Sequence, residues 1–162
     1  MSNPRAICDR YEAAVRAYSR DCASDLSSWH RPDVAEFSEL RRLLTPYAES
    51  GDMLCQYALA TILWLGLCCV SEEQFMEGHS VACEEATRWW IAAAKQGHLP
   101  ALDNLVGSGV GSEAQQAREA FRKLECERRD LVGSSHGMPI YGDEFIQELS
   151  RRFYGRVTTD AV

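Results

Sequence analysis

Apolar residues recur at three- and four-residue steps along most of the chain, which is the spacing of one face of an α-helix. The first such stretch contains Ile7, Tyr11, Ala14, Val15, Tyr18 and Cys22. The same spacing predicts helices over residues 5–23, 34–46, 53–67, 84–96, 99–107, 112–130 and 143–154. No segment alternates as a half-buried β-strand does, so the predicted fold class is all-α.

Two polar or glycine-rich stretches interrupt this pattern. Residues 24–33 are rich in turn formers, and Asp33 is placed to cap the following helix. That helix is expected to falter near Pro46, because proline has no N–H to donate to the helical ladder. Residues 132–142 contain three glycines and a proline, and they are predicted to form a loop before the last helix.

The chain resembles itself when it is shifted by 46 residues. The shift aligns "YAESGDMLCQYALA" with "AAKQGHLPALDNLV", and Gly51 then meets Gly97. Each copy has the pattern of a helix, a glycine-containing break and a second helix. A glycine suits the left-handed position that follows a helix end. The small residues around each break would let the two helices approach closely.

The second copy is similar to the Sel-one-like repeat family, short relatives of the tetratricopeptide repeat. The family pattern is Lys-Ala-x-x-Trp-Tyr-x-Lys-Ala-Ala-x-Gln-Gly, followed by an Ala and then a Leu-Gly pair. The matching residues are Ala86, Trp89, Trp90, Ala93, Ala94, Gln96, Gly97, Ala101 and Leu105. The resemblance covers residues 36–125, with one clear unit and two degenerate ones.

The resemblance implies a short right-handed α-solenoid of antiparallel helix pairs with extra N- and C-terminal helices. Residues 1–30 would supply the N-terminal helix, residues 131–162 a loop and the C-terminal helix, and residues 1–162 a single domain. In this family the Trp, Ala and Gly positions serve packing, so Trp89 is expected in the core. Trp90 occupies the tyrosine position of the family and is expected nearer the surface. His98, directly after the turn, is expected to be structural.

Composition and charge argue against nucleic-acid-binding, membrane and exported proteins. The 162 residues are 46% hydrophobic and carry a net charge of −7, which argues against nucleic acid as a partner. No apolar run reaches the roughly 20 residues that a membrane helix needs, so no membrane association is expected. The N-terminus is charged almost at once and lacks the apolar core of a signal peptide, which predicts a cytoplasmic protein.

The seven cysteines are predicted to be reduced. Their number is odd, no export signal accompanies them, and their spacing is irregular. Cys8, Cys22 and Cys55 fall on the apolar stripes of predicted helices, where a free cysteine behaves as a small hydrophobic residue.

Residues 67–83, "LCCVSEEQFMEGHSVAC", depart from the family pattern and form a longer insertion. From Ser71 to Glu85 there are five glutamates and no lysine or arginine. One interpretation is a solvated acidic loop whose Phe75 and Met76 fold back on the core. The other is a protrusion that steers and anchors a partner with a basic surface. The residues predicted to bind such a partner are Glu72, Glu73, Phe75, Met76, Glu77, Glu84, Glu85 and Trp90.

Metal binding and catalysis are the competing interpretations. The insertion holds four soft ligands, Cys68, Cys69, His79 and Cys83, but adjacent cysteines do not easily bind one ion. No cysteine or serine stands in a recognisable activated setting. We therefore predict no cofactor, no metal and no enzymatic activity; His136 in the 132–142 loop is the residue to test first if an activity were found.

The family resemblance implies a non-catalytic protein–protein interaction module of bacterial type. A compact acidic member fits a narrower prediction, an immunity protein that neutralises a secreted effector toxin. The alternatives are an adaptor or regulatory scaffold and, from another class, a small enzyme or metalloprotein that uses the cysteine-rich insertion.

Overall fold

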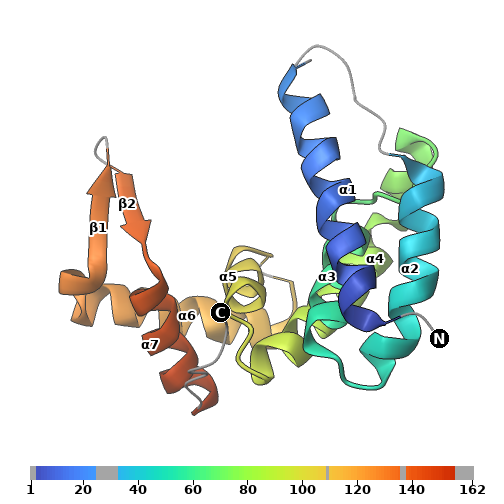
Figure 1. Cartoon of the computed structure of the whole chain (residues 1–162). Coiled ribbons are helices and arrows are strands. Elements are labelled where there is room, and N and C mark those ends of the chain that lie inside the picture. Colours follow the sequence, from blue (N-terminus) through green and yellow to red (C-terminus); the bar gives the residue numbers. More distant parts are fainter. Residues whose placement is uncertain (1–2, 25–32, 109, 136–137, 156–162) are drawn as a thin grey trace. The chain divides into compact units, whose positions relative to one another are not determined.

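The computed structural model describes residues 3–24, 33–108, 110–135 and 138–155 (Figure 1). These residues form seven α-helices, one 3-10 helix and one β-hairpin, so the fold is mostly helical, as predicted. The contacts divide the chain into two compact units, Met1–Trp89 and Trp90–Val162, and the boundary falls within one helix, α4. That the whole chain is a single domain stays a prediction. No helix in the described part of the chain combines the length and apolarity required to cross a bilayer.

The first unit contains α1 (Pro4–Ser24), α2 (Val34–Glu49), α3 (Met53–Trp64) and the start of α4 (Glu72–Lys95). Helices α1, α2 and α3 pack against one another, and their ribbons lie side by side in Figure 1. The core of this unit consists of the apolar stripes that the spacing predicted, including Ile7, Tyr11, Phe37, Leu40, Leu44, Leu59 and Ile62.

The ends of α2 test two sequence predictions. Asp33 caps the helix as expected, because its Oδ1 accepts a hydrogen bond of 3.0 Å from the N–H of Glu36. The expected break at Pro46 is wrong, since α2 continues to Glu49. Pro46 lies in the last turn, and its carbonyl accepts from the N–H of Ser50 at 3.1 Å. Residues 25–32, most of the predicted turn-rich stretch, lie outside the described residues.

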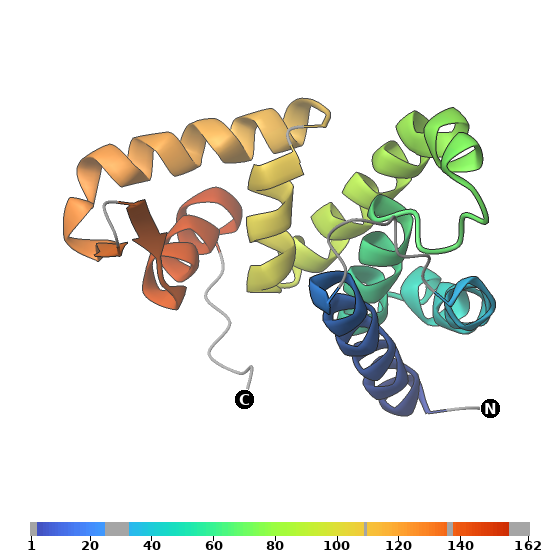
Figure 2. The same ribbon diagram turned by 90° about the horizontal axis from the view of Figure 1, so that it is seen from above.

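The second unit contains the end of α4, α5 (Leu99–Ser108), α6 (Ser112–Glu127), a 3-10 turn (Arg129–Leu131) and α7 (Asp143–Tyr154). Helices α5, α6 and α7 pack together (Figure 2). Their buried side chains include Leu102, Leu105, Leu124, Phe145 and Leu149. The predicted last helix, residues 143–154, is confirmed.

The stretch 132–142 is not the loop that its glycines and proline predicted. It forms an antiparallel hairpin of β1 (Val132–Ser135) and β2 (Met138–Tyr141), in which Val132 pairs with Tyr141. The Tyr141 ring packs against Phe121 and Phe145, with ring centroids 4.6 and 5.0 Å away. Tertiary packing of this kind overrides the weak strand propensity of a short glycine-rich segment.

The two predicted helix breaks have the same backbone geometry. Gly51 and Gly97 have φ angles of 98° and 97°, which side chains rarely adopt. The N–H of Gly51 donates to the carbonyl of Ala48, and the N–H of Asp52 donates to that of Tyr47. The equivalent donors 46 positions on, Gly97 and His98, bond to Ala94 and Ala93. Each break is therefore a Schellman turn, as the self-match predicted.

Burial repeats with the same 46-residue offset. The buried residues Phe37, Leu40, Leu44, Ala48, Cys55 and Leu59 correspond in order to Cys83, Ala86, Trp90, Ala94, Ala101 and Leu105, which are also buried. Both copies thus bury the same helical positions but fill them with side chains of different size. Core volume is conserved in such arrangements by pairing large residues with small ones.

Candidate functional site

The insertion is mainly helical rather than a loop. Helix α4 begins at Glu72, so the acidic residues lie on its first four turns. The Ser71 hydroxyl accepts from the N–H of Gln74 at 3.2 Å, and the Gln74 side chain accepts from the N–H of Val70 at 2.8 Å. Ser-Glu-Glu-Gln is the signature of a capping box, and acidic residues are favourable at a helix N-terminus. This local signal in the sequence could have revealed the helix start.

Phe75 folds back on the first unit, as one of the two interpretations of the insertion proposed. A Cβ atom added at Gly66 would lie 2.2 Å from the Phe75 ring, so only a glycine leaves room for it. The Phe75 ring also contacts His79, with ring centroids 4.6 Å apart, and the centroid of the Trp64 ring lies 6.4 Å from that of His79. Phe75 therefore anchors α4 to the turn after α3 and is engaged within the chain.

Three of the predicted carboxylates form a stripe on α4. Glu73, Glu77 and Glu84 are exposed and are separated by four and seven residues, which places them on one face of a helix. Val81 lies on the same stripe, between Glu77 and Glu84. Glu85 points elsewhere, because it forms an ion pair of 3.8 Å with Arg41 of α2.

Exposed apolar side chains occur in the same segment of the chain, residues 65–84. Leu65, Val70, Met76 and Val81 are 47%, 59%, 66% and 69% exposed, although each belongs to a residue type that is usually buried. We call the exposed side chains of Leu65, Val70, Glu72, Glu73, Met76, Glu77, Val81 and Glu84 the insertion surface. It combines negative charge with large apolar groups, the two features that the sequence predicted for a partner-binding protrusion.

The expected roles of the two tryptophans are reversed. Trp90 is only 3% exposed, so the prediction that it lies nearer the surface is wrong. Trp89 is the half-buried one. The reason is the repeat register, because Trp90 occupies the position of buried Leu44, and Trp89 that of half-buried Leu43. Trp90 is consequently not part of the insertion surface.

The insertion does not gather its four soft ligands. Cys83 Sγ lies 3.5 Å from the nearer ring nitrogen of His79, one turn away on α4. Burial raises the pKa of the Cys83 and Cys68 thiols, which disfavours the thiolate that a nucleophilic reaction requires. In the described part of the chain, the set of three ligand atoms within 4.8 Å of one another is instead Cys8, Asp52 and Cys55.

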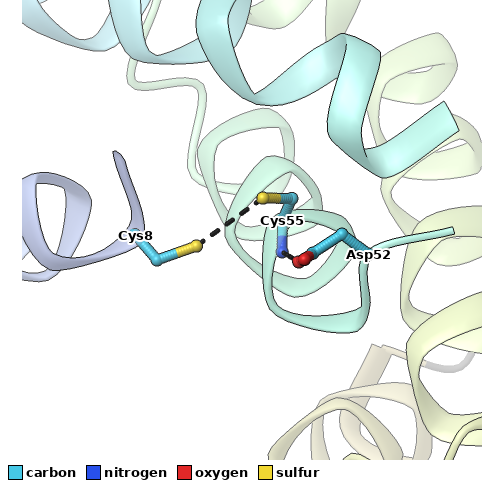
Figure 3. Close-up of side chains that lie close together, drawn as sticks. All are labelled: Cys8, Asp52 and Cys55. Atoms are coloured by element: carbon cyan, nitrogen blue, oxygen red, sulfur yellow. Dashed lines mark hydrogen bonds between the residues drawn. The ribbon is translucent and has the colours of Figure 1, made fainter. Parts of the chain in front are cut away.

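This second cluster lies between α1 and the first turn of α3 (Figure 3). Cys8 Sγ is 3.7 Å from Cys55 Sγ, and both side chains are buried. The hydrogen bond from the Cys55 thiol lowers the pKa of Cys8, and the same pairing raises the pKa of Cys55. Asp52 Oδ1 caps α3 by accepting from the N–H of Cys55 at 2.9 Å. The sequence predicts both thiols only as core residues, since no motif joins Cys8 to the Asp-x-x-Cys segment.

His98 is a helix cap in the second unit. Its Nδ1 accepts from the N–H of Ala101 at 3.2 Å, the same position at which Asp52 caps α3 in the first copy. Burial lowers the pKa of His98 to about 4, so the ring is neutral and able to accept at neutral pH. His136 lies outside the described residues.

No family model, curated protein or solved structure matches this chain in comparisons with known proteins.

Proposed function

We propose that this chain is a non-catalytic protein-binding module built from Sel-one-like repeats, and that the insertion surface is where it binds. The single observation that carries this proposal is the exposure of four large apolar side chains beside a stripe of carboxylates on one segment, residues 65–84. Isolated apolar residues are common on protein surfaces, but clusters with a polar rim are typical of interaction sites.

The negative charge of the insertion surface favours a partner with a basic surface. Glu72, Glu73, Glu77 and Glu84 would attract a basic protein over a long range, and Met76 and Val81 would supply contact area after docking. Methionine suits such a role because its flexible, polarisable side chain adapts to the partner. The net charge of −7 acts in the same direction.

The repeated Schellman turns and the repeated burial pattern support the repeat assignment. With it we propose a short right-handed α-solenoid and a cytoplasmic location. Proteins of this architecture bind other proteins, because stacked helix pairs present extended surfaces. The narrower form of the proposal is a bacterial immunity protein that neutralises a cationic effector toxin. An adaptor or regulatory scaffold is the broader form.

Affinity capture with matched charge variants tests the proposal. The test variant reverses Glu73, Glu77 and Glu84 to lysine, and the control reverses Glu49, Asp103 and Glu119, which are also exposed but lie elsewhere. Both variants change the net charge equally. We expect a basic protein from the source cells to be retained by the native chain and the control but not by the test variant. Equal retention on all three would contradict the proposal.

A growth assay distinguishes an immunity protein from an adaptor or scaffold. If the retained protein is a toxin, its expression alone should arrest growth, and co-expression of the native chain, but not of the test variant, should restore growth. A retained protein that leaves growth unchanged would contradict the immunity form and favour the adaptor form.

A further inference from the structure

We propose that Cys8, Asp52 and Cys55 form a binding site for a soft divalent cation, with zinc as the expected ion. The inference concerns the first unit alone and does not depend on the proposed function. Its basis is the juxtaposition of two buried sulfurs and a half-buried carboxylate from α1 and from the N-terminal end of α3 (Figure 3).

The distance between the sulfurs fits a zinc ion. Two Zn–S bonds of about 2.3 Å at a tetrahedral angle of about 109° place their sulfurs about 3.8 Å apart. Cys8 Sγ and Cys55 Sγ are 3.7 Å apart. A disulfide requires about 2.05 Å, so the two sulfurs are not bonded to each other in this structure.

The third ligand is held in place by the fold. Asp52 Oδ1 accepts from the Cys55 N–H at 2.9 Å, which fixes the carboxylate over the first turn of α3. One carboxylate oxygen is sufficient for a zinc ligand, and the hydrogen-bonded partner restricts its orientation. Since Asp52 is half-buried whereas both thiols are buried, the carboxylate side is where an ion would enter.

The arrangement is specific to the first copy of the repeat. The positions equivalent to Asp52 and Cys55 are His98 and Ala101, and alanine cannot ligate. In the resembling family the latter position is also alanine. The core therefore accepts a small apolar residue here, and the thiol is not required for packing. A zinc ion at this site would link α1 to α3. Cys8 lies on α1, Cys55 lies on α3, and Asp52 is the N-cap residue of α3.

Metal titration of the full chain tests the proposal. The protein is stripped with a chelator, kept reduced with a phosphine and titrated with Zn²⁺ against a chromophoric competitor. Co²⁺ then serves as a spectroscopic probe, because thiolate ligation produces a charge-transfer absorption. We expect one ion per chain, a thiolate band, and a thermal midpoint that rises with zinc concentration.

The variants assign the ligands. Cys8→Ser should remove part of the thiolate band and weaken zinc binding at least about tenfold. Loss of a residue that only hydrogen-bonds to a metal ligand already weakens binding by about 10- to 100-fold, so loss of a ligand should cost at least the lower value. Asp52→Asn should weaken binding by a similar factor while preserving the fold, because asparagine is an equally good N-cap. It keeps the test informative if Cys8→Ser does not fold. Cys83→Ser and exposed Cys126→Ser are the controls and should bind as the native chain does.

Three results would overturn the proposal. The first is a folded native chain that binds neither Zn²⁺ nor Co²⁺. The second is stoichiometric binding that survives Asp52→Asn and Cys8→Ser or is lost in the Cys83→Ser control. The third is a Cys8–Cys55 disulfide in freshly purified protein, found by mass mapping, because sulfurs joined in a disulfide do not supply thiolate ligands.

Discussion

The turn at Gly51 and the turn at Gly97 share a backbone but differ in chemistry. Both have the same pair of Schellman hydrogen bonds and a side-chain cap three residues before the buried small residue of the next helix. In the first copy the cap is the charged Asp52 next to two thiols, and in the second it is the neutral His98 next to Ala101. The comparison teaches that the glycines and small residues maintain the architecture. The N-cap position and the small buried position after it tolerate different residues, and so they can carry metal-binding groups.

The largest effect on stability should come from the two tryptophans that precede the second turn. Trp90→Ala should reduce the free energy of unfolding by about 3–5 kcal/mol, because a large buried side chain is lost. Trp89→Ala should cost less than about 2 kcal/mol, since Trp89 is only half-buried and loses less contact area. Urea unfolding of the two variants measures both values. A larger loss for Trp89 would contradict the repeat register.

Substitution of the glycine should destabilise both turns. Gly51→Ala and Gly97→Ala should each destabilise the protein by about 1–3 kcal/mol, because alanine at φ near 98° is strained. Gly97 should give the larger loss, since it is buried and therefore has less room for a methyl group, whereas Gly51 is exposed and a Cβ there meets nothing within 4 Å. Thermal unfolding with native-like circular dichroism checks this. A neutral Gly97→Ala would mean that the turn is not constrained as described.

The caps should differ in their dependence on pH. His98 is neutral in the folded protein, where burial holds its pKa at about 4, but takes up a proton below about 6.5 when unfolded. Stability should therefore fall as the pH drops from about 6.5 to 4, by about 1–3 kcal/mol from this residue. His98→Asn keeps a capping acceptor and should lose less stability over that range than the native chain. Identical pH profiles would show that His98 is as accessible to protons folded as unfolded.

The sequence predicted the parts of the fold that depend on spacing. The helices other than the start of α4 (residues 72–83), the Asp33 cap and both glycine turns follow from local pattern and from the 46-residue self-match. The hairpin could not be predicted in this way, because its stability depends on Tyr141 packing with Phe121 and Phe145 from other elements. Pro46 was misjudged because a proline in the last turn disturbs few hydrogen bonds.

The candidate sites show the same limit. The acidic stripe was predictable as a charged segment, and its capping box at Ser71 was present in the sequence, yet the inward turn of Phe75 depends on Gly66, nine residues away. The order of the two tryptophans follows from the register of the repeat rather than from the family's tyrosine position. Cys8 and Cys55 are 47 residues apart, so only the folded chain brings them together.

The repeats supply the architecture, and we propose that the insertion surface supplies binding. Two properties of the triple variant Glu73/Glu77/Glu84→Lys separate these roles. Its free energy of unfolding should stay close to that of the native chain, because exposed side chains far from the core change stability by only about 0.5 kcal/mol each.

The most direct measurement is the association rate of the captured partner as a function of salt concentration. For the native chain the rate should fall steeply with salt, since long-range attraction is screened within roughly 8 Å at physiological ionic strength. The triple variant should associate at least about tenfold more slowly at low salt and show a nearly flat salt dependence. The control Glu49/Asp103/Glu119→Lys should retain most of the native slope. Equal slopes for the native chain and the triple variant would contradict the claim.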